Sequence, residues 1–244
     1  MKKLYVVGIG PGDPMGMTAE AHAALAASDL LCGYTEYIRL LQPVFPGHET
    51  FTTPMMQEIA RCRRALDEAQ KGRVVAMVCS GDAGVYGMAA PLLELATDYP
   101  AVDIEVVAGV TAAQSGAARL GAPLGHDYVV ISLSDLLTPW SIIEKRLAAV
   151  AAADFCLCIY NPSSKKRKEH LAKACSILKR YKTGETVCGW ARNIGRDGQQ
   201  TGILTLDQLE KMEADMFTAI FVGNSETKII DGRMVTPRGY GGMP

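Results

Sequence analysis

Short apolar segments alternate with helix-like segments along the chain, and this alternation restricts the fold more than any other feature of the sequence. In the first half, the strand-like segments are residues 4–7, 74–79 and 104–107, and the helix-like segments are residues 18–27, 55–70, 84–96 and 111–120. A strand that is apolar throughout, such as residues 74–79, is typical of a parallel sheet covered on both faces. The order of strands and helices therefore predicts an α/β fold with mainly parallel central sheets.

A second alternating series follows residues 121–125 (GAPLG), a segment that favours a turn. Its strand-like segments are residues 128–131, 155–160, 186–190 and 217–222, and its helix-like segments are residues 142–150 and 164–181. Near the end, Asp231 and Gly232 separate two apolar pairs, which predicts a β-hairpin. We therefore expect two α/β domains, residues 1–121 and residues 126–244.

The charge balance argues against strongly basic classes of protein. The 244 residues include 25 Lys and Arg and 26 Asp and Glu, a formal charge of -1, with a pI near 6.4. This balance disfavours nucleic acid or an anionic membrane as a partner. The longest apolar stretch, residues 147–160, is interrupted by Asp154 and is shorter than the roughly 18 residues of a membrane helix. Since the N-terminus also has no apolar signal segment, we expect a cytoplasmic protein.

The cysteines and histidines do not predict a metal site. The seven cysteines contain no Cys-x-x-Cys pair, and Cys156 and Cys158 would share one face of a strand. Buried thiols in a reducing compartment are the more common explanation of such a set. The histidines, at positions 22, 48, 126 and 170, have no metal-ligand spacing. We expect no protein-bound metal.

Three predicted loops follow apolar strands, where ligands bind in open α/β sheets. The first, residues 8–14 (GIGPGDP), resembles a dinucleotide-binding loop, but Asp13 occupies the position of its last glycine, which argues against a nicotinamide or flavin. In the second, residues 80–87 (SGDAGVYG), the glycines permit close approach of a ligand, and Asp82 either contacts that ligand or caps the turn. The third loop (AGVTA) carries Thr111 as a helix N-cap or a ligand contact.

These loops together carry a resemblance to a known family. GIGPGDP, SGDAGVYGMA and AGVTAA, in this order and spacing, resemble the tetrapyrrole methyltransferases, which use S-adenosylmethionine (SAM). In the second half, SLSDLLTPW, YNPSS, GRDG, TAIFVGNS and TPRGY resemble one branch of that family, which methylates carbon 17 of precorrin-3B or cobalt-factor III during ring contraction in cobalamin biosynthesis. Two departures from the wider family, Ala83 after Gly81-Asp82 and Asn161-Pro162 after Tyr160, fit this branch. The resemblance covers essentially the whole chain.

The resemblance implies a fold and a set of site residues. Members of the family have two α/β domains with an active-site cleft between them, SAM at its floor and the tetrapyrrole above, and they are similar in forming homodimers. Pro11 would border the substrate trough beside the cofactor. The other residues implied to contact SAM are Gly81, Asp82, Val85, Tyr86, Thr111 and Ala112 from the first domain, and Tyr160, Asn161, Arg192, Thr218 and Ala219 from the second. S-adenosylhomocysteine would be the product.

Methyl transfer to an electron-rich ring carbon mainly requires that the two reactants are held in line. Ring contraction also requires proton transfers. We consider Asp13, Ser134 and Asp135 as catalytic candidates for these transfers because they lie in strand-end loops.

A tetrapyrrole with many carboxylates requires cationic or hydrogen-bonding partners. The candidates for this role are Tyr34, Tyr37 and Arg39 in the segment CGYTEYIR, since arginine forms bidentate pairs with carboxylates. The basic run at residues 165–168 is a further candidate, although such runs are more often solvated.

Several alternatives stay open at this level. A sister methyltransferase acting at another ring position, or a relative that methylates ribosomal RNA or diphthamide, would share the loops. A nicotinamide-dependent oxidoreductase would use the first glycine loop, and a non-enzymatic tetrapyrrole carrier would bind the macrocycle but not SAM. Neither composition nor motifs decide whether the substrate contains cobalt.

Overall fold

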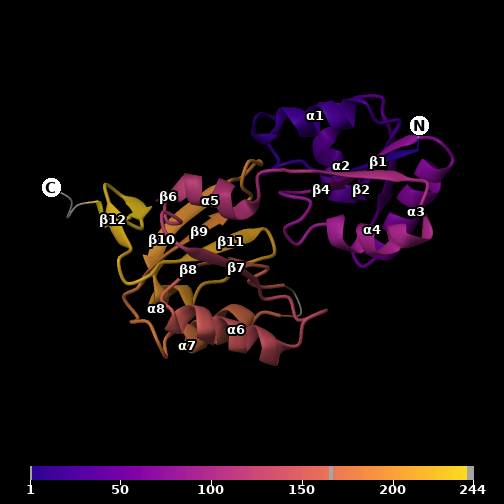
Figure 1. The fold of residues 1–244 in the computed structure, drawn as a ribbon. Helices are drawn as coiled ribbons and strands as arrows, with labels where there is room; N and C mark the ends of the chain where they lie inside the picture. The colour runs from indigo at the N-terminus through magenta and orange to yellow at the C-terminus, as the bar shows by residue number, and fades with distance from the viewer. Residues whose placement is uncertain (1, 165–166, 241–244) are drawn as a thin grey trace. The chain divides into compact units, whose positions relative to one another are not determined.

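The computed structural model describes residues 2–164 and 167–240 (Figure 1). Within it the chain forms two compact units, Met1–Ala112 and Ala113–Pro244. Each unit is built around its own five-stranded sheet. The predicted α/β fold class is therefore confirmed, with helices packed on the sheets of both units.

The first unit contains a fully parallel sheet. Its strands are β1 (Lys3–Gly8), β2 (Leu30–Tyr34), β3 (Glu49–Thr53), β4 (Val74–Cys79) and β5 (Asp103–Val107), in the order β3-β2-β4-β1-β5. Its helices are η1 (Pro14–Gly16), α1 (Ala19–Ala26), α2 (Thr35–Leu41), α3 (Glu58–Gln70), α4 (Ala89–Leu95) and η2 (Ala96–Asp98). The strands β2 and β3 and the helix α2 were not predicted, because this part of the sequence mixes short apolar and polar runs.

Helices cover both faces of this sheet, and neighbouring residues of β1 contribute to opposite cores. Val7 packs with Ala21 and Leu25 of α1, whereas Val6 packs with Ala65 of α3 and Leu92 of α4. The chain therefore leaves β1 toward one face and leaves β4 toward the other. Since β1 and β4 are adjacent, the connections reverse direction at their carboxyl ends, which is where open α/β sheets bind ligands.

The second unit contains a mixed sheet with the order β10-β9-β11-β8-β7 and a small sheet with the order β12-β13-β6. Its strands are β6 (Gly121–Ala122), β7 (Tyr128–Ser132), β8 (Cys156–Tyr160), β9 (Val187–Arg192), β10 (Gln200–Thr205), β11 (Thr218–Val222), β12 (Lys228–Ile230) and β13 (Arg233–Val235). Its helices are α5 (Ala112–Leu120), α6 (Trp140–Ala152), α7 (His170–Leu178) and α8 (Leu206–Leu209). Helices α6, α7 and α8 share one core with the sheet, and α6 and α7 lie side by side (Figure 1).

The expectation of mainly parallel sheets holds for the first unit but not for the second. In its five-stranded sheet β7 and β8 pair in parallel, whereas β11 is antiparallel to both β8 and β9, and β10 is antiparallel to β9. All five residues of β11 are buried. A strand that is apolar on both faces has the same pattern of apolar residues whether it runs parallel or antiparallel to its neighbours. The pattern therefore could not reveal that β11 is antiparallel.

The division between the units lies at the start of α5, between Ala112 and Ala113, whereas we expected it between residues 121 and 126. A Cβ atom on Gly116 would lie 2.8 Å from the ring of Phe221, so α5 packs closely on the sheet of the second unit. The expected turn also contains strand β6, which pairs with β13. Glycine and proline therefore mark a bend inside the second unit rather than its boundary.

Two smaller expectations concern the end and the middle of this unit. The predicted β-hairpin is confirmed, because β12 and β13 pair around Asp231 and Gly232, both at positive φ. The helix expected over residues 164–181 begins only at His170, and residues 165 and 166 of that expectation lie outside the described residues.

All seven cysteines are buried and none forms a disulfide. Burial raises the pKa of the Cys32, Cys79 and Cys175 thiols to about 12. These side chains are therefore protonated near neutral pH and serve as packing groups, as the sequence predicted. No helix among the described residues is long and apolar enough to cross a bilayer.

Candidate functional site

The three glycine loops of the first unit meet at one edge of its sheet. They follow β4, β1 and β5, which are neighbours in the sheet, so their carboxyl ends lie side by side. The amide of Gly10 donates to the carbonyl of Gly81 at 3.0 Å, and the amide of Gly81 donates back to the carbonyl of Gly10 at 2.7 Å. The first two loops are thus joined through their backbones.

Glycine is required where these loops touch. A Cβ atom on Gly8 would lie 2.7 Å from the carbonyl oxygen of Gly81 and 2.8 Å from the amide nitrogen of Gly109. A Cβ atom on Gly109 would collide with the carbonyl oxygens of Gly8 and Gly81. Because these contacts are with backbone atoms, no side-chain rotation could relieve them. The edge is therefore a surface of close-packed backbone.

Asp82 connects two of the loops. Its Oδ1 accepts hydrogen bonds from the amides of Gly84 at 2.8 Å and Val85 at 3.0 Å, and its Oδ2 accepts one from the amide of Gly109 at 2.9 Å. Of the two roles that the sequence left open, the structure shows the capping role. Asp82 thereby fixes the shape of the glycine-rich turn.

The turn after Asp82 presents two apolar side chains to solvent. Val85 is 37% exposed and Tyr86 is 60% exposed, and Tyr86 has a φ of 53°. A non-glycine residue in this conformation is strained, and such strain is common at binding sites. Thr111 and Ala112 lie beside the same turn, since a Cβ atom on Gly81 would be 3.6 Å from Thr111 Cα and 3.7 Å from Ala112 N.

The first loop places Pro11 and Asp13 differently. Pro11 packs on Gly16, where an added Cβ atom would lie 2.9 Å from Pro11 Cγ. Asp13 is exposed, and its carboxylate accepts a hydrogen bond from the Met15 amide at 2.8 Å, which caps η1. The Asp13 carboxylate therefore stabilises its own loop.

The candidates for binding substrate carboxylates lie at the end of β2 and on α2. The rings of Tyr34 and Tyr37 meet edge to face, with centroids 5.2 Å apart. Arg39 pairs with Glu36 at 2.6 Å, and its side chain is 71% exposed. An exposed pair of this kind is weak, so a substrate carboxylate could displace Glu36 at little cost.

The candidates in the second unit also come together at one edge of a sheet. In the pairing of the strands, Thr218 lies opposite Arg192, Ala219 is opposite Ala191, and the following Ile220 is opposite Ile159. Because β11 runs antiparallel to β8 and β9, its first residues meet the last residues of both. Tyr160 and Asn161 therefore share an edge with Arg192, Thr218 and Ala219.

Asp215, which the sequence analysis missed, organises this edge. Its Oδ2 lies 2.6 Å from Arg192 Nη2, and its Oδ1 accepts hydrogen bonds from the Thr218 hydroxyl at 2.8 Å and the Phe217 amide at 3.0 Å. The only sequence signal for this role is an aspartate shortly before the strand, where Asx turns are common.

The end of β8 is held by two further hydrogen bonds. The hydroxyl of Tyr160 accepts a hydrogen bond from the amide of Ala113 at 2.6 Å, in the first turn of α5. Asn161 has a φ of 51°, and its Nδ2 donates to the Ser132 hydroxyl at 2.9 Å. Both side chains are thus used to shape the edge.

Ser134 and Asp135 belong to a polar cluster with two residues that were not predicted as partners. Arg167 donates to the Ser134 hydroxyl at 2.6 Å and lies 3.5 Å from Asp135, and His170 Nε2 lies 3.2 Å from the other oxygen of Asp135. Partial burial raises the pKa of the Asp135 carboxyl, but the contact with His170 and the charge of Arg167 lower it more, so the net pKa lies below its ordinary value. Asp135 is therefore ionised near neutral pH.

The basic run at residues 165–168 is only partly described, because residues 165 and 166 lie outside the described residues. Arg167 is not solvated as such runs usually are: its side chain is 19% exposed and faces Ser134 and Asp135. Within the described ranges, no group of three or more His, Cys, Asp or Glu side chains could hold a metal ion.

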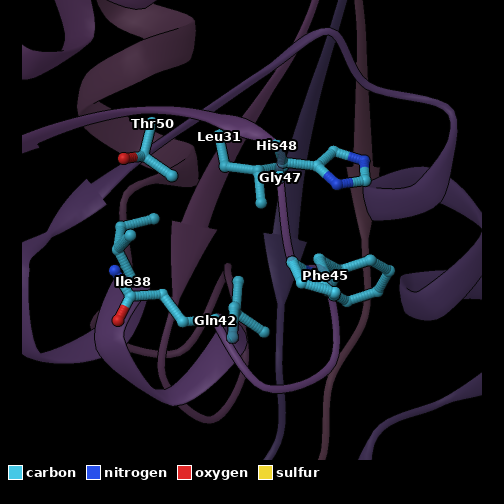
Figure 2. Close-up of a pocket in the computed structure, with 9 residues that line it drawn as sticks. Leu31, Ile38, Gln42, Phe45, Gly47, His48 and Thr50 are labelled. Atoms are coloured by element: carbon cyan, nitrogen blue, oxygen red, sulfur yellow. The ribbon is translucent and has the colours of Figure 1, made fainter.

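A separate pocket of about 270 Å³ lies in the first unit (Figure 2). It is lined mainly by apolar side chains, among them Leu31, Ile38 and Phe45, with His48 and Thr50. Leu31 pairs with Thr50 near the start of β2 and β3, away from the carboxyl ends of these strands. None of the predicted site residues lines this pocket.

A parallel sheet with a backbone-built edge at the point where its connections reverse is typical of α/β proteins that bind a small molecule. Residues 3–210 match the family described as Tetrapyrrole (Corrin/Porphyrin) Methylases. The chain belongs to this family of methylases. The resemblance predicted from the motifs is thereby confirmed, and the oxidoreductase alternative is not supported.

The chain is similar to two curated proteins of cobalamin biosynthesis. It is 44% identical over 238 residues to the "Probable cobalt-factor III C(17)-methyltransferase" of Salmonella typhimurium, covering 97% of this chain and 99% of that protein. It is 45% identical over 239 residues to the "Cobalamin biosynthesis protein CbiHC" of Archaeoglobus fulgidus, covering 98% of this chain. The chain spans only 53% of the length of the Archaeoglobus protein.

Solved structures show the same fold. The crystal structure of the methyltransferase CobJ aligns with a TM-score of 0.89 at 35% identity, covering 96% of this chain and 99% of that one. The cobalt precorrin-4 methyltransferase CbiF aligns with a TM-score of 0.76 at 23% identity, covering 91% of this chain and 95% of that one. At this lower identity the likeness shows the fold alone.

Proposed function

We propose that this chain transfers the methyl group of SAM to carbon 17 of precorrin-3B or cobalt-factor III in cobalamin biosynthesis. The observation that carries the proposal is the 44% identity to the Salmonella relative over nearly the full length of both chains. Membership of the methylase family supplies the reaction class. The motifs of the second half supply the choice of branch, as the sequence analysis set out.

SAM is the proposed methyl donor, and the edge of the first unit fits such a ligand. The close-packed glycines support a turn at Gly84, Val85 and Tyr86 that is exposed, so a ligand can approach its backbone. The exposed side chains of Val85 and Tyr86 offer an apolar contact beside them. One solved neighbour is a uroporphyrin-III methyltransferase complexed with S-adenosylhomocysteine.

The proposed reaction places few demands on acid or base groups in its first step. A carbon–carbon bond forms at the ring, and the sulfur–carbon bond of SAM breaks with its electron pair remaining on sulfur. The positive charge passes to the macrocycle and is balanced when the macrocycle loses a proton. The main tasks of the protein are therefore to hold the two reactants in line and to exclude water.

The later ring contraction, which remains part of the proposal, needs proton transfers. Asp135 is held ionised by its neighbours, so it suits the role of proton acceptor or positioning group rather than donor. The Ser134 hydroxyl accepts from Arg167, which leaves its own proton available for donation to a ligand. Asp13 caps its own loop and is the weakest of the three candidates.

The experiment is incubation of the chain with SAM and, separately, precorrin-3B and cobalt-factor III, followed by mass spectrometry. We expect one added methyl group on one of the two substrates and formation of S-adenosylhomocysteine. The same assay decides whether the substrate contains cobalt. Methylation only of another precorrin would replace the proposal with the sister activity.

SAM binding is tested independently by thermal unfolding. SAM at 100 times its dissociation constant stabilises the folded state by about 2.7 kcal/mol, whereas NADH is expected to leave the melting temperature unchanged. A homodimer and a cytoplasmic location are also proposed from the resemblance, and light scattering of the purified chain tests the first of these.

A further inference from the structure

The loop after β7 carries two adjacent leucines that are open to solvent. Leu136 is 66% exposed and Leu137 is 99% exposed, the highest value among the large apolar side chains of the described residues. Single exposed apolar side chains are common on protein surfaces. Two neighbouring leucines on one loop tip form a small apolar surface that a binding partner could cover.

The base of this loop is held firmly. On one side, Arg167 bonds the Ser134 hydroxyl at 2.6 Å, and both Arg167 and His170 contact the carboxylate of Asp135. On the other side, the ring of Trp140 meets the ring of His170 edge to face, with centroids 4.7 Å apart. Trp140 also packs against the core of the second unit.

The position of the His170 ring satisfies one of its two nitrogens and not the other. Its Nε2 contacts Asp135, whereas its Nδ1 is buried and has no hydrogen-bond partner among the described residues. An unsatisfied buried nitrogen is unfavourable. The position of the ring is therefore set by Asp135 and Trp140, which is the arrangement expected if the ring serves to hold the loop.

The loop begins at the edge that carries the predicted SAM residues. Ser132, the last residue of β7, pairs with Tyr160 in the sheet, and its hydroxyl accepts a hydrogen bond from Asn161 at 2.9 Å. A fixed loop that presents leucines from this edge would contact a ligand bound beside Tyr160 and Asn161.

We propose that Leu136 and Leu137 contact the apolar face of the tetrapyrrole macrocycle, and that Asp135, Arg167 and His170 are positioning residues that hold this loop. The inference rests on the proposed function. The macrocycle fits the leucines better than SAM does, because it has a wide apolar face with charges at its rim, whereas SAM is small and charged. Arg167, which contacts the Asp135 carboxylate next to Leu136 in the chain, is a cation that suits the acidic rim.

The test replaces both leucines together, Leu136→Ser with Leu137→Ser, and measures the KM for the tetrapyrrole and the dissociation constant of SAM. Loss of two buried leucine contacts predicts a KM that rises roughly tenfold or more, with SAM affinity unchanged. The matched control is Ile229→Ser with Ile230→Ser, two adjacent side chains on β12 that are 55% and 42% exposed. The control should keep the wild-type KM.

The positioning role of Asp135 is tested with Asp135→Asn. The need for an apolar side chain at the loop is tested with the single variant Leu137→Met. Asp135→Asn should raise the KM for the tetrapyrrole by a smaller factor than the double leucine variant, again without a change in SAM affinity. Leu137→Met keeps an apolar side chain, so it should retain most of the wild-type affinity for the macrocycle, unlike the double leucine variant.

The outcomes separate this inference from the proposed function. If the wild-type chain methylates carbon 17 but the double variant keeps its KM, the inference is overturned and the function stands. If the chain methylates another tetrapyrrole position, the function is replaced, and the same variants test the loop with that substrate. A chain that methylates no tetrapyrrole overturns both.

Discussion

The sheet edges that carry the predicted site residues are stabilised by different contacts in the two units. In the first unit, backbone atoms of Gly8, Gly81 and Gly109 pack against one another, and the Asp82 carboxylate bonds to amides. In the second unit, side chains bond to side chains: Arg192 and Thr218 share Asp215, and Asn161 bonds Ser132. A backbone-built edge tolerates no added atom, whereas a side-chain network tolerates a substitute with similar hydrogen bonds.

The strongest test of this comparison is Gly109→Ala in the first unit. The added Cβ atom would collide with the carbonyl oxygens of Gly8 and Gly81, so the strands must move apart. We expect a loss of about 1–3 kcal/mol in the free energy of unfolding and at least a tenfold loss of SAM affinity. Chemical denaturation and calorimetric titration with SAM measure the two effects.

Gly84→Ala is the matched control for this substitution. Its Cβ atom would meet only the Oδ1 atom of Asp82, at 3.3 Å, which a small side-chain rotation can relieve. We expect a much smaller change in both quantities. Equal effects of the two substitutions would show that the close approach of the backbones does not define the edge.

The second test is Asp215→Ala in the second unit. Removal of this carboxylate leaves Arg192 and Thr218 without their shared partner, but the Arg192 side chain is 48% exposed and can be solvated. We expect a loss of about 1 kcal/mol in stability and a several-fold loss of SAM affinity.

Asp215→Asn sharpens the comparison. The asparagine oxygen can still accept from the Thr218 hydroxyl, so this variant should recover part of the SAM affinity. Recovery by a similar side chain is expected in the second unit and is impossible at Gly109. If Asp215→Asn is as impaired as Asp215→Ala, charge rather than hydrogen-bond geometry organises this edge.

The smallest expected effect concerns the stability of the fold at acidic pH. Burial raises the pKa of Asp154, but the hydrogen bonds from Lys182 at 2.8 Å and from the Ser225 hydroxyl at 2.6 Å lower it more, so the net pKa is below its ordinary value. A depressed pKa stabilises the fold at pH values above about 3.9, the unfolded value. This stabilisation is lost as the pH falls through the folded value.

Asp154→Asn should therefore lower the free energy of unfolding at pH 7 and flatten its decline in acid. Because the Asp154 side chain is 44% exposed, we expect the difference to stay below about 1 kcal/mol. Asp231→Asn, at another aspartate with positive φ, is the matched control for the effect of the substitution on the backbone. Denaturation curves at pH 7, 4 and 3 compare the variants. An unchanged acid decline in Asp154→Asn would contradict this account of the ion pair.

The motifs predicted the loops well, because repeated glycines directly after a buried strand indicate a tight loop at the end of that strand. Gly81, Asp82 and Thr111 lie together at the carboxyl ends of β4 and β5, the two strands that flank β1, as expected of an open α/β sheet. The predicted SAM contacts and the cleft between the domains stay predictions. The contacts of Arg167 and His170 with Asp135, and of Asp215 with Arg192, were not predicted, because these partners are distant from each other in the sequence.

By itself, the sequence determined the α/β class, the glycine loops and the family, since all three depend on local composition and on motifs in a fixed order. Only the tertiary structure decided the direction of β11, the position of α5 in the second unit and the partners of Asp135. An apolar strand looks the same in both directions, and a charged side chain does not indicate which distant residue will pair with it. These features arise only when the strands are assembled into a sheet.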